Sequence, residues 1–375
     1  GARARRQDRD NGQARSHAAM LHHAAVDLPY LTADLPGTGG LLRAAPEDFV
    51  VDEVPAYPPN GTGDHVFVRI EKRGLTTSQA VQRIARALGA GERDVGVAGM
   101  KDRHAVTRQW LSLPPPITPE AALAFADPDV RVLEATRHDH KLRTGHVRAN
   151  RFVLRVRDAV PEAVARARAI LDVLAGPPGA PNWYGEQRFG RDGDNAARGR
   201  AIVMGEKPPR AGDGAGRASP VPRDRKLARL LVSALQSELF NQWLVARMAD
   251  GLYARVLAGD VLHKHGDGMF TCEDAATDEA RLAAGELVVT GPMFGATMRS
   301  AAGDAGARED AILAAAGLAQ GSFASVSRIA EGTRRDASIQ VGEAGVAASD
   351  ETVEVRFTLP GGAYATAVMR EIMKC

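Results

Sequence analysis

The chain has 375 residues, 44% of them hydrophobic and 25% charged, so it can bury a large core and is long enough for two domains or for one domain with a large insertion. Its 48 lysines and arginines barely exceed its 46 acidic residues, which excludes a polycation and requires any nucleic-acid-binding surface to come from uneven placement of charge. Two distant cysteines and the lack of any apolar run of about 18 residues exclude a disulfide framework, a cysteine zinc site and a membrane span, so we expect a cytoplasmic protein.

The first residues, GARARRQDRDNGQARSHAAM, are rich in arginine and lack both aromatic residues and hydrophobic periodicity. We therefore expect a disordered tail over residues 1–27 and, because the segment has no apolar middle part, no secretory signal. After the tail, DFVVDEV at 48–54 and DHVFVRIEKRG at 64–74 predict two strands, the second because its apolar and polar residues alternate.

The stretch TTSQAVQRIARALGAG, residues 76–91, predicts a helix, because its apolar residues recur at helical spacing. Thr77 or Ser78 is the expected N-cap, and Gly89 or Gly91 the expected stop. The following GVAGMKDR, residues 96–103, contains small residues that let the backbone approach a neighbour closely. It therefore belongs at a strand end or in a loop.

Asp102 is wedged between Lys101 and Arg103 in this loop. An aspartate among cations stays ionised, because opposite charge favours the charged form. Such a carboxylate is a poor proton donor and a ready nucleophile or ion-pair partner. The residues of the loop alone do not decide between these two roles.

Further along, FVLRVR at 152–157 predicts a strand and PEAVARARAILDVLAG at 161–176 a helix that starts with proline. Residues 206–225 are rich in glycine, proline and charge, which is typical of a mobile excursion, whereas 228–248 predict a long amphipathic helix. A mixture of short elements follows, with an alanine-rich helix near residue 311, and TVEVRFTLP at 352–360 predicts a last strand. We expect an α+β core over 28–191 and 329–375, built from both ends of the chain, with 192–328 inserted.

Cations gather between residues 131 and 157, where eight lysines and arginines stand against two acids, a local net charge of +6. Clustered cations neutralise phosphates, and the salt-sensitive part of nucleic-acid affinity grows with the number of phosphates contacted. A solvated basic face is the alternative interpretation. Within the tract, Asn150 and Phe152 are two residues apart, so in a strand they share a face, where an aromatic ring can stack on an extruded base. Taken alone, Phe152 fits a core residue better than a stacking platform.

Two other patterns have weaker implications. The stretch NWYGEQRFGRDGDN, residues 182–195, matches neither a P-loop nor a dinucleotide fingerprint, so it is either structural or a substrate contact. The pairs His138 with His140 and His263 with His265 could each place two imidazoles on one face of a strand, but neither has a third ligand nearby in the sequence. Since a zinc site needs three or four ligands, we expect no metal.

Eight blocks, in this order, resemble those of the tRNA pseudouridine synthase D family. They are PEDFVVDEV, HVFVRIEKRGLTT, VAGMKDRHAVTRQW, RHDHKLRTGHVRANRF, PNWYGEQRFGRDGDN, TGPMFG, EGTRR and LPGGAYATAVMREI. The resemblance extends from about Gly37 to Ile372. Several long blocks in the right order are far more specific than any single short motif.

The resemblance implies a pseudouridine synthase catalytic fold, an α+β structure with a mixed, largely antiparallel sheet and a large inserted α+β domain. It implies an RNA-binding isomerase that flips a uridine out of tRNA, at position 13 in bacterial relatives and with tRNA-Glu as the expected substrate. The base would be detached at N1, rotated and rejoined through C5. We expect no cofactor, no obligate protein partner and a monomer.

The resemblance also implies roles for individual residues. Asp102 matches the catalytic aspartate, and Arg43 matches its basic partner, at a position where many relatives have lysine. Phe152 matches the phenylalanine that stacks on the base, and Asn150 a neighbouring asparagine of the active site. We further expect substrate or RNA contacts from Lys101, Arg103, His104, Lys141, Arg143 and Arg151, and supporting roles from Glu47, which could orient Arg43 or the nearby loop, and from Tyr184, Arg188 and Phe189.

Two other function classes stay open on the residues alone. A non-catalytic protein that binds or folds tRNA on the same scaffold would explain the basic tract but would leave Asp102 without a purpose. A metal-dependent nuclease using Asp102 and Glu47 is less favoured, because two separated carboxylates hold Mg²⁺ poorly.

Overall fold

The computed structural model describes residues 27–206, 224–264, 266–349 and 351–375. The predicted tail, apart from Asp27, and nearly all of the predicted excursion at 206–225 lie outside these residues. The chain forms two compact units. The first, which we call the sheet unit, comprises Tyr30–Trp183, Gly251–Thr290 and Asp336–Cys375, and the second, the helix unit, contains Tyr184–Asp250 and Gly291–Arg335.

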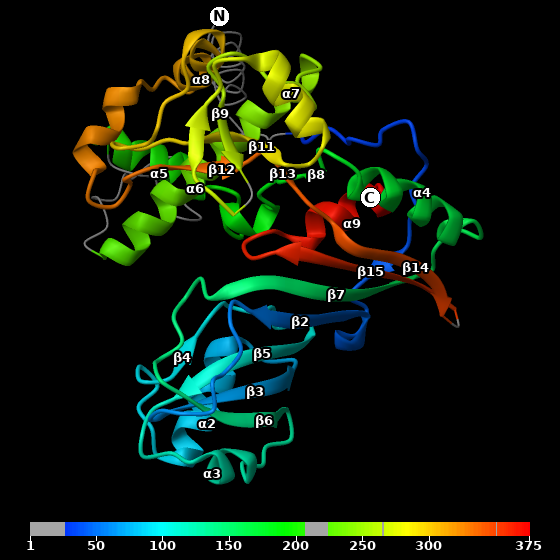
Figure 1. Cartoon of the computed structure of the whole chain (residues 1–375), viewed down its shortest axis with the longest axis vertical. Helices are drawn as coiled ribbons and strands as arrows, with labels where there is room; N and C mark the ends of the chain where they lie inside the picture. The colour runs from blue at the N-terminus through cyan, green and yellow to red at the C-terminus, as the bar shows by residue number, and fades with distance from the viewer. Residues whose placement is uncertain (1–26, 207–223, 265, 350) are drawn as a thin grey trace, which may run out of the picture. The chain divides into compact units, whose positions relative to one another are not determined.

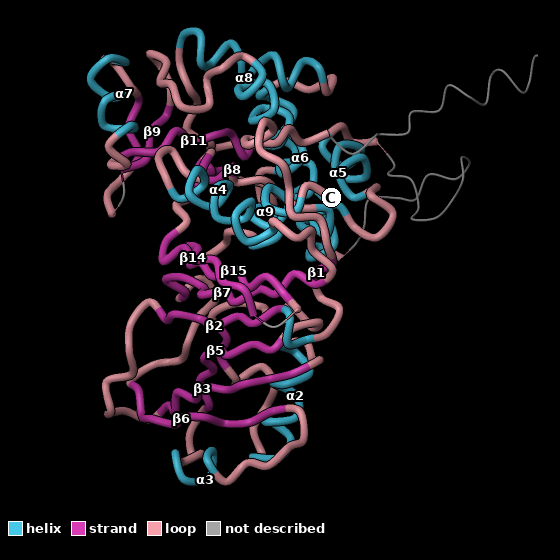
Figure 2. The backbone as a smooth tube through the Cα atoms, turned by 90° about the vertical axis from the view of Figure 1, so that its right-hand side faces the viewer, coloured by secondary structure: helices cyan, strands magenta, loops and turns pink. Residues whose placement is uncertain are grey.

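A nine-stranded sheet organises the sheet unit, with the strand order β14-β15-β7-β2-β5-β3-β6, and short β1 and β4 pair with β7 and β5 (Figures 1 and 2). Strands β2 and β5 are parallel to each other, whereas the other neighbouring strands in this order are antiparallel. The strands are β1 Leu41–Leu42, β2 Phe49–Pro55, β3 His65–Arg73, β4 Gly96–Val97, β5 Val106–Leu113, β6 Val130–His138, β7 Val147–Arg157, β14 Gly342–Ser349 and β15 Thr352–Pro360. Strands from the two ends of the chain thus lie side by side in one mixed, largely antiparallel sheet.

The two larger apolar clusters lie on one face of this sheet, which we call the inner face, because alternate residues of each strand point to the same side. Phe67 and Trp110 belong to a smaller buried cluster on the other face. Phe152 of β7 is paired with Val51 of β2 and with Phe357 of β15, and all three are buried. The helices α4 (Ala163–Ala175) and α9 (Ala365–Met373) share one apolar cluster with these strands, and α2 (Thr77–Leu88) shares a second with β3, β5 and β6. A short helix, α3 (Pro119–Leu123), precedes β6.

Helix α2 begins one residue earlier than the sequence pattern predicts. Its N-cap is Thr76, whose hydroxyl accepts from Gln79 N in a capping box, and it ends at Gly89 in the left-handed region, φ 70°. Neither Thr77 nor Ser78 is the cap. Thr77 is buried instead and donates its hydroxyl to Gln109 Oε1, 2.9 Å away on β5. The hydroxyl of Thr77 thus joins α2 to β5 by a hydrogen bond and does not cap the helix.

Residues 251–290 contribute a smaller group of elements to the sheet unit. They include β9 (Val261–Lys264), β10 (Met269–Thr271), α7 (Ala275–Ala283) and the first residues of β11 (Leu287–Met293). The strand order of this second sheet is β10-β9-β11-β12, with β12 at Thr333–Asp336. A two-stranded pair joins β8 (Ala180–Pro181) to β13 (Ser338–Ile339). Residues 251–290 belong to the sheet unit, so the boundaries of the two compact units differ from those of the predicted insertion, 192–328. The insertion itself stays a prediction.

The helix unit is built around α6 (Arg225–Ala249), which includes the predicted helix 228–248. It also contains α5 (Asn195–Val203), α8 (Gly303–Ala315) and the 3₁₀ helices η2 (Glu186–Phe189) and η3 (Gln320–Val326). Gly199 permits close packing of α5 on α6, since a Cβ there would lie 2.1 Å from Leu231 O. No helix in the described part of the chain is long and apolar enough to cross a membrane.

Candidate active site

The predicted catalytic residue and its predicted partner meet in the sheet unit. Asp102 lies in the loop between β4 and β5, and its Oδ2 is 3.0 Å from Arg43 Nη2. The side chain of Asp102 is 41% exposed and that of Arg43 is 24% exposed, so the pair is accessible from solvent without being fully solvated. Although Lys101 and Arg103 flank Asp102 in the sequence, the cation that pairs with its carboxylate comes from 59 residues away.

Arg43 is held in an unusual backbone conformation. Its φ is 67°, in the left-handed region that non-glycine residues occupy at a cost of roughly 1–3 kcal/mol. Its guanidinium lies over the Phe49 ring, 4.0 Å from the ring centre. Its Nε is buried and has no hydrogen-bond partner within the described part of the chain. The backbone conformation and the contact with Phe49 thus set the direction in which the guanidinium meets Asp102.

Lys101 attaches the Asp102 loop to the sheet. Its Nζ is 2.5 Å from Glu53 Oε2, and the two side chains are 7% and 0% exposed. The other Glu53 oxygen accepts from Trp110 N at 3.1 Å, and Lys101 N donates to the Thr77 hydroxyl at 2.9 Å. The structure thus gives this ammonium a buried carboxylate partner, and its contact with RNA stays a prediction.

Asn150 and Phe152 share the inner face of the sheet, as their spacing predicts, since they pair with Glu53 and Val51 of β2. Phe152 is 7% exposed and packs edge-on against Phe49, with ring centres 6.2 Å apart. The Oδ1 atom of Asn150 is buried and lacks a hydrogen-bond partner among the described residues. Phe49 therefore links the Arg43 guanidinium to Phe152, and the stacking role of Phe152 stays a prediction.

Three further predicted residues lie near the Asp102 loop or before β2. Arg103 and His104 are exposed, and Arg103 Nε donates to Gly74 O at 3.3 Å. Glu47, in the 3₁₀ helix η1 (Pro46–Asp48), pairs with Arg73 Nε at 2.6 Å. The carboxylate of Glu47 is thus directed to Arg73, whereas Arg43 is oriented by Asp102 and Phe49.

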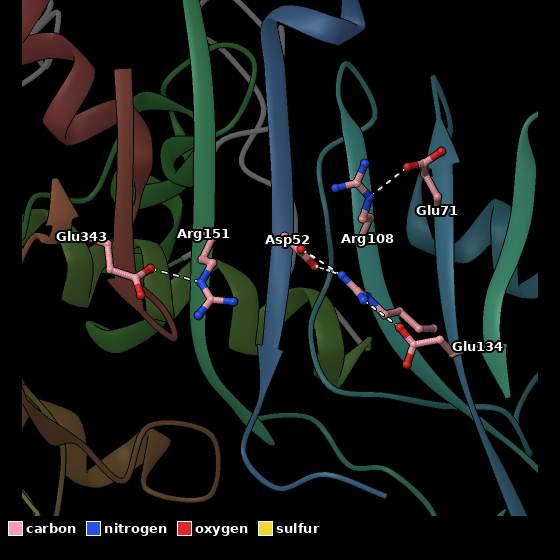
Figure 3. A network of polar contacts seen from close by, with 7 residues as sticks. Asp52, Glu71, Arg108, Glu134, Arg151 and Glu343 are labelled. Atoms are coloured by element: carbon pink, nitrogen blue, oxygen red, sulfur yellow. Dashed lines mark hydrogen bonds and ion pairs between the residues drawn. The ribbon is translucent and has the colours of Figure 1, made fainter. Parts of the chain in front are cut away.

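Many cations of the basic tract are paired with acids on neighbouring strands. Figure 3 shows Arg151 with Glu343, at 3.1 Å, on the face of the sheet opposite to Phe152. On the same face, Arg108 pairs with Glu71, and Asp52 and Glu134 bind the same guanidinium, that of Arg69. Three more tract residues have such partners: Arg131 with Glu71, Arg155 with Glu354 and Arg157 with Asp48. Four of the eight cations of the tract thus have an acidic partner from outside it.

Other cations of the tract lie in the loop between β6 and β7 or directly after it. Lys141 Nζ donates to Arg93 O at 2.6 Å. Arg143 and Arg148 are exposed and have no acidic partner within the described part of the chain. This loop contacts the loop of Asp102, since Gly145 N donates to Ala98 O at 2.8 Å. Arg143 is thus an available cation in a loop that contacts the loop of Asp102, and Arg137 of β6 is also exposed without an acidic partner among the described residues.

The three described histidines of the two predicted pairs have partners within the protein. His138 and His140 approach each other with Nε2 atoms 3.3 Å apart, and His138 stacks on Tyr57. Burial lowers the pKa of His138, which favours its neutral form. His263 pairs with Asp336, and His265 lies outside the described residues. Among the residues that the structure describes, no group of three or more histidines, cysteines and acids could hold a metal ion.

Tyr184, Arg188 and Phe189 belong to the helix unit. Tyr184 is buried, and its backbone N and O both bond to the Asn241 side chain. Arg188 Nε donates to Ser237 Oγ at 3.0 Å, and its Nη2 donates to Ser233. Phe189 closes η2. Tyr184 and Arg188 are thus parts of the packing around α6.

Reasoning from the sequence missed the buried polar residues under the Asp102 loop. Glu53 continues the inner-face series Phe49 and Val51, and Lys72 continues Val66, Val68 and Ile70. Charged residues at positions where the alternation predicts core are costly unless they have partners. The break in alternation was therefore the available signal. It occurs on β2 and β3, the two strands that flank β5.

Comparisons with known proteins agree over nearly the whole chain. The family model of tRNA pseudouridine synthase D matches residues 25–209 and 217–372. A tRNA pseudouridine synthase D from Anaeromyxobacter dehalogenans is 55% identical over 350 residues, covering 93% of this chain and 97% of its own. One from Thermus thermophilus is 43% identical over 347 residues, covering 92% of each chain.

A crystal structure from Methanosarcina mazei, described as that of a candidate tRNA pseudouridine synthase D, has a similar fold. Its TM-score is 0.72 at 24% identity, over 91% of this chain and 95% of the other. This similarity, together with the mixed, largely antiparallel sheet, confirms the predicted α+β fold class.

Proposed function

Because the chain belongs to the tRNA pseudouridine synthase D family, we propose that it isomerises a uridine of tRNA to pseudouridine, with Asp102 as the catalytic carboxylate. The observation that carries the assignment is the ion pair of Asp102 with Arg43 at 3.0 Å. The pair gives a partly exposed carboxylate of the sheet unit a fixed orientation.

The reaction breaks the bond between C1′ and N1 and forms one between C1′ and C5. The proton of C5 is lost and N1 gains one, so the product is an isomer and no electrons are exchanged. An ionised carboxylate near C1′ and C2′ can either attack the sugar or take its 2′ proton. Arg43 serves both routes, because it orients the carboxylate and offsets its desolvation when the base enters.

The target base has to leave its stack to reach Asp102, at a cost of a few kcal/mol. Phe152 supports this step in the proposal, since stacking on an aromatic ring returns roughly 1–3 kcal/mol. Asn150 offers a buried amide oxygen without a protein partner among the described residues, on the same face as Phe152. An imide N–H of uracil would satisfy it.

The finer assignment rests on the resemblance of the motif blocks. We propose position 13 of tRNA-Glu as the substrate, residues 28–191 and 329–375 as the catalytic core, and a monomer that needs neither cofactor nor protein partner. Arg103, His104, Lys141 and Arg143 are the proposed RNA contacts in the loops near Asp102.

The test is carbodiimide mapping of pseudouridine in an unmodified tRNA-Glu transcript after incubation with the protein in EDTA. We expect one new pseudouridine at position 13 with the wild type, none with Asp102→Asn, and normal product with Asp64→Asn, which removes an exposed carboxylate before β3. Product from Asp102→Asn would refute the catalytic role. Intact tRNA binding without product from the wild type would favour a non-catalytic tRNA-binding protein.

A further inference from the structure

A second cation lies beneath the Asp102 loop and takes no part in the chemistry proposed above. Lys72 belongs to β3, its side chain is 0% exposed, and the register pairs it with Thr107 of β5 and Val130 of β6. Val68 and Ile70 precede it on the same face and are core residues. A lysine thus occupies a position that the alternation of the strand assigns to an apolar side chain.

The ammonium of Lys72 binds backbone atoms of two loops. Its Nζ donates to Asp102 O at 2.8 Å and to Leu75 O at 2.6 Å. Leu75 precedes α2, and Asp102 precedes β5. The two bonds therefore connect the residue proposed to be catalytic to the start of the helix that covers this part of the sheet. Charge-assisted bonds of this kind are stronger than neutral ones.

The charge of Lys72 also depends on its neighbours. Burial lowers the pKa of Lys72 to about 8. The nearby Asp102 carboxylate raises this pKa, and the nearby Lys101 ammonium lowers it further. Lys101 is itself neutralised by Glu53, and Asp102 also faces Arg43.

We propose that Lys72 is a positioning residue for the reaction, whose ammonium fixes the backbone of Asp102 and supports its negative charge while the base enters. The proposal rests on the function proposed above. Lys72 is a buried cation and is distinct from Arg43, because Arg43 contacts the Asp102 carboxylate whereas Lys72 binds its backbone oxygen.

The experiment compares Lys72→Met with Lys374→Met as a matched control. Lys374 is also largely buried in the sheet unit, 14% exposed, and its Nζ binds Thr32 Oγ1 and Glu371. For Lys72→Met we expect kcat on tRNA to fall at least about 100-fold with KM changed less than about threefold. Lys374→Met should keep kcat, although it also removes a largely buried ammonium. A folded Lys72→Met with kcat within about threefold of the wild type would overturn the proposal.

The pH profile gives a readout that a merely structural lysine would not move. Lys72 is protonated below its pKa, so the wild-type rate should fall as pH rises through about 8. Lys72→Arg keeps the donors and the charge at higher pH, so it should retain part of the activity and lose this alkaline fall. An unchanged alkaline fall in Lys72→Arg would contradict the proposal.

Hydrogen exchange separates this inference from the proposed function, because it needs no activity. In Lys72→Met, the amides of residues 98–105 should exchange at least about tenfold faster than in the wild type, whereas in Lys374→Met they should not. Unchanged exchange there would refute the positioning role even if the protein makes pseudouridine. Faster exchange in a protein that makes none would refute only the proposed reaction.

Discussion

Arg43 and Asp102 meet through one nitrogen and one oxygen, Nη2 and Oδ2, at 3.0 Å, while the rest of the guanidinium lies over Phe49. A lysine ammonium can make such a single contact as well as an arginine guanidinium can. The pair therefore accommodates either basic residue in its electrostatic role, whereas the stacking on Phe49 is specific to arginine.

Replacing Arg43 tests this division. Arg43→Ala should lower kcat about 100-fold, because the carboxylate loses its orienting partner. Arg43→Lys should stay within about tenfold of the wild type, because the charge is kept and only the stacking is lost. Single-turnover rates on tRNA transcript measure both, and equal losses in the two variants would show that stacking, not charge, is what matters.

The buried pair of Lys101 and Glu53 should be important for stability. Glu53→Gln or Lys101→Met alone leaves a buried charge unpaired and should lower the free energy of unfolding by about 3–5 kcal/mol. The double variant should lose less than the sum of the two, since no unpaired charge remains. Urea titration of the four proteins measures this coupling, and strict additivity would mean that the two groups do not interact.

The cations of the basic tract should differ in their effect on tRNA affinity. Arg143→Gln and Arg148→Gln should each reduce the slope of log affinity against log salt by about 0.7–0.9, as for one lost phosphate contact. Arg155→Gln should leave the slope unchanged, because that guanidinium is paired with Glu354 at 2.8 Å. Filter binding from low to moderate salt measures the slopes. A lower slope for Arg155→Gln would mean that RNA displaces the pair.

Asp48 should make stability depend on acid pH. Hydrogen bonding to Arg157 lowers the pKa of Asp48 below its usual 3.8, in spite of its burial. Since the folded pKa is below the unfolded one, the stabilisation is present above pH 3.8 and is lost as pH falls through the folded pKa. Asp48→Asn should therefore be less stable at neutral pH and should lose less stability on acidification. Denaturant midpoints measured from about pH 6 downwards test this, and parallel curves for the two proteins would count against it.

The sequence alone was enough to predict the family, the place of Asp102 in a loop and most of the regular elements. Strand alternation and helical spacing are local properties, so β3, α2, α6 and β15 follow from neighbouring residues. Asn150 and Phe152 were placed on one face for the same reason. The cap of α2 was misplaced by one residue, because several threonines and serines in a row can each cap a helix and packing of Thr77 on Gln109 selects among them.

Only the tertiary structure decided which charges are available. The basic tract has a net charge of +6 along the chain, but Glu343, Glu354, Asp48 and Glu71 reach it from other strands and from η1. Likewise, Lys72 is near Asp102 because strand pairing and loop packing bring them together, not because of their spacing. Side-chain periodicity tells which face a residue takes, whereas its partner depends on cross-strand register, which places residues far apart in sequence within hydrogen-bonding distance.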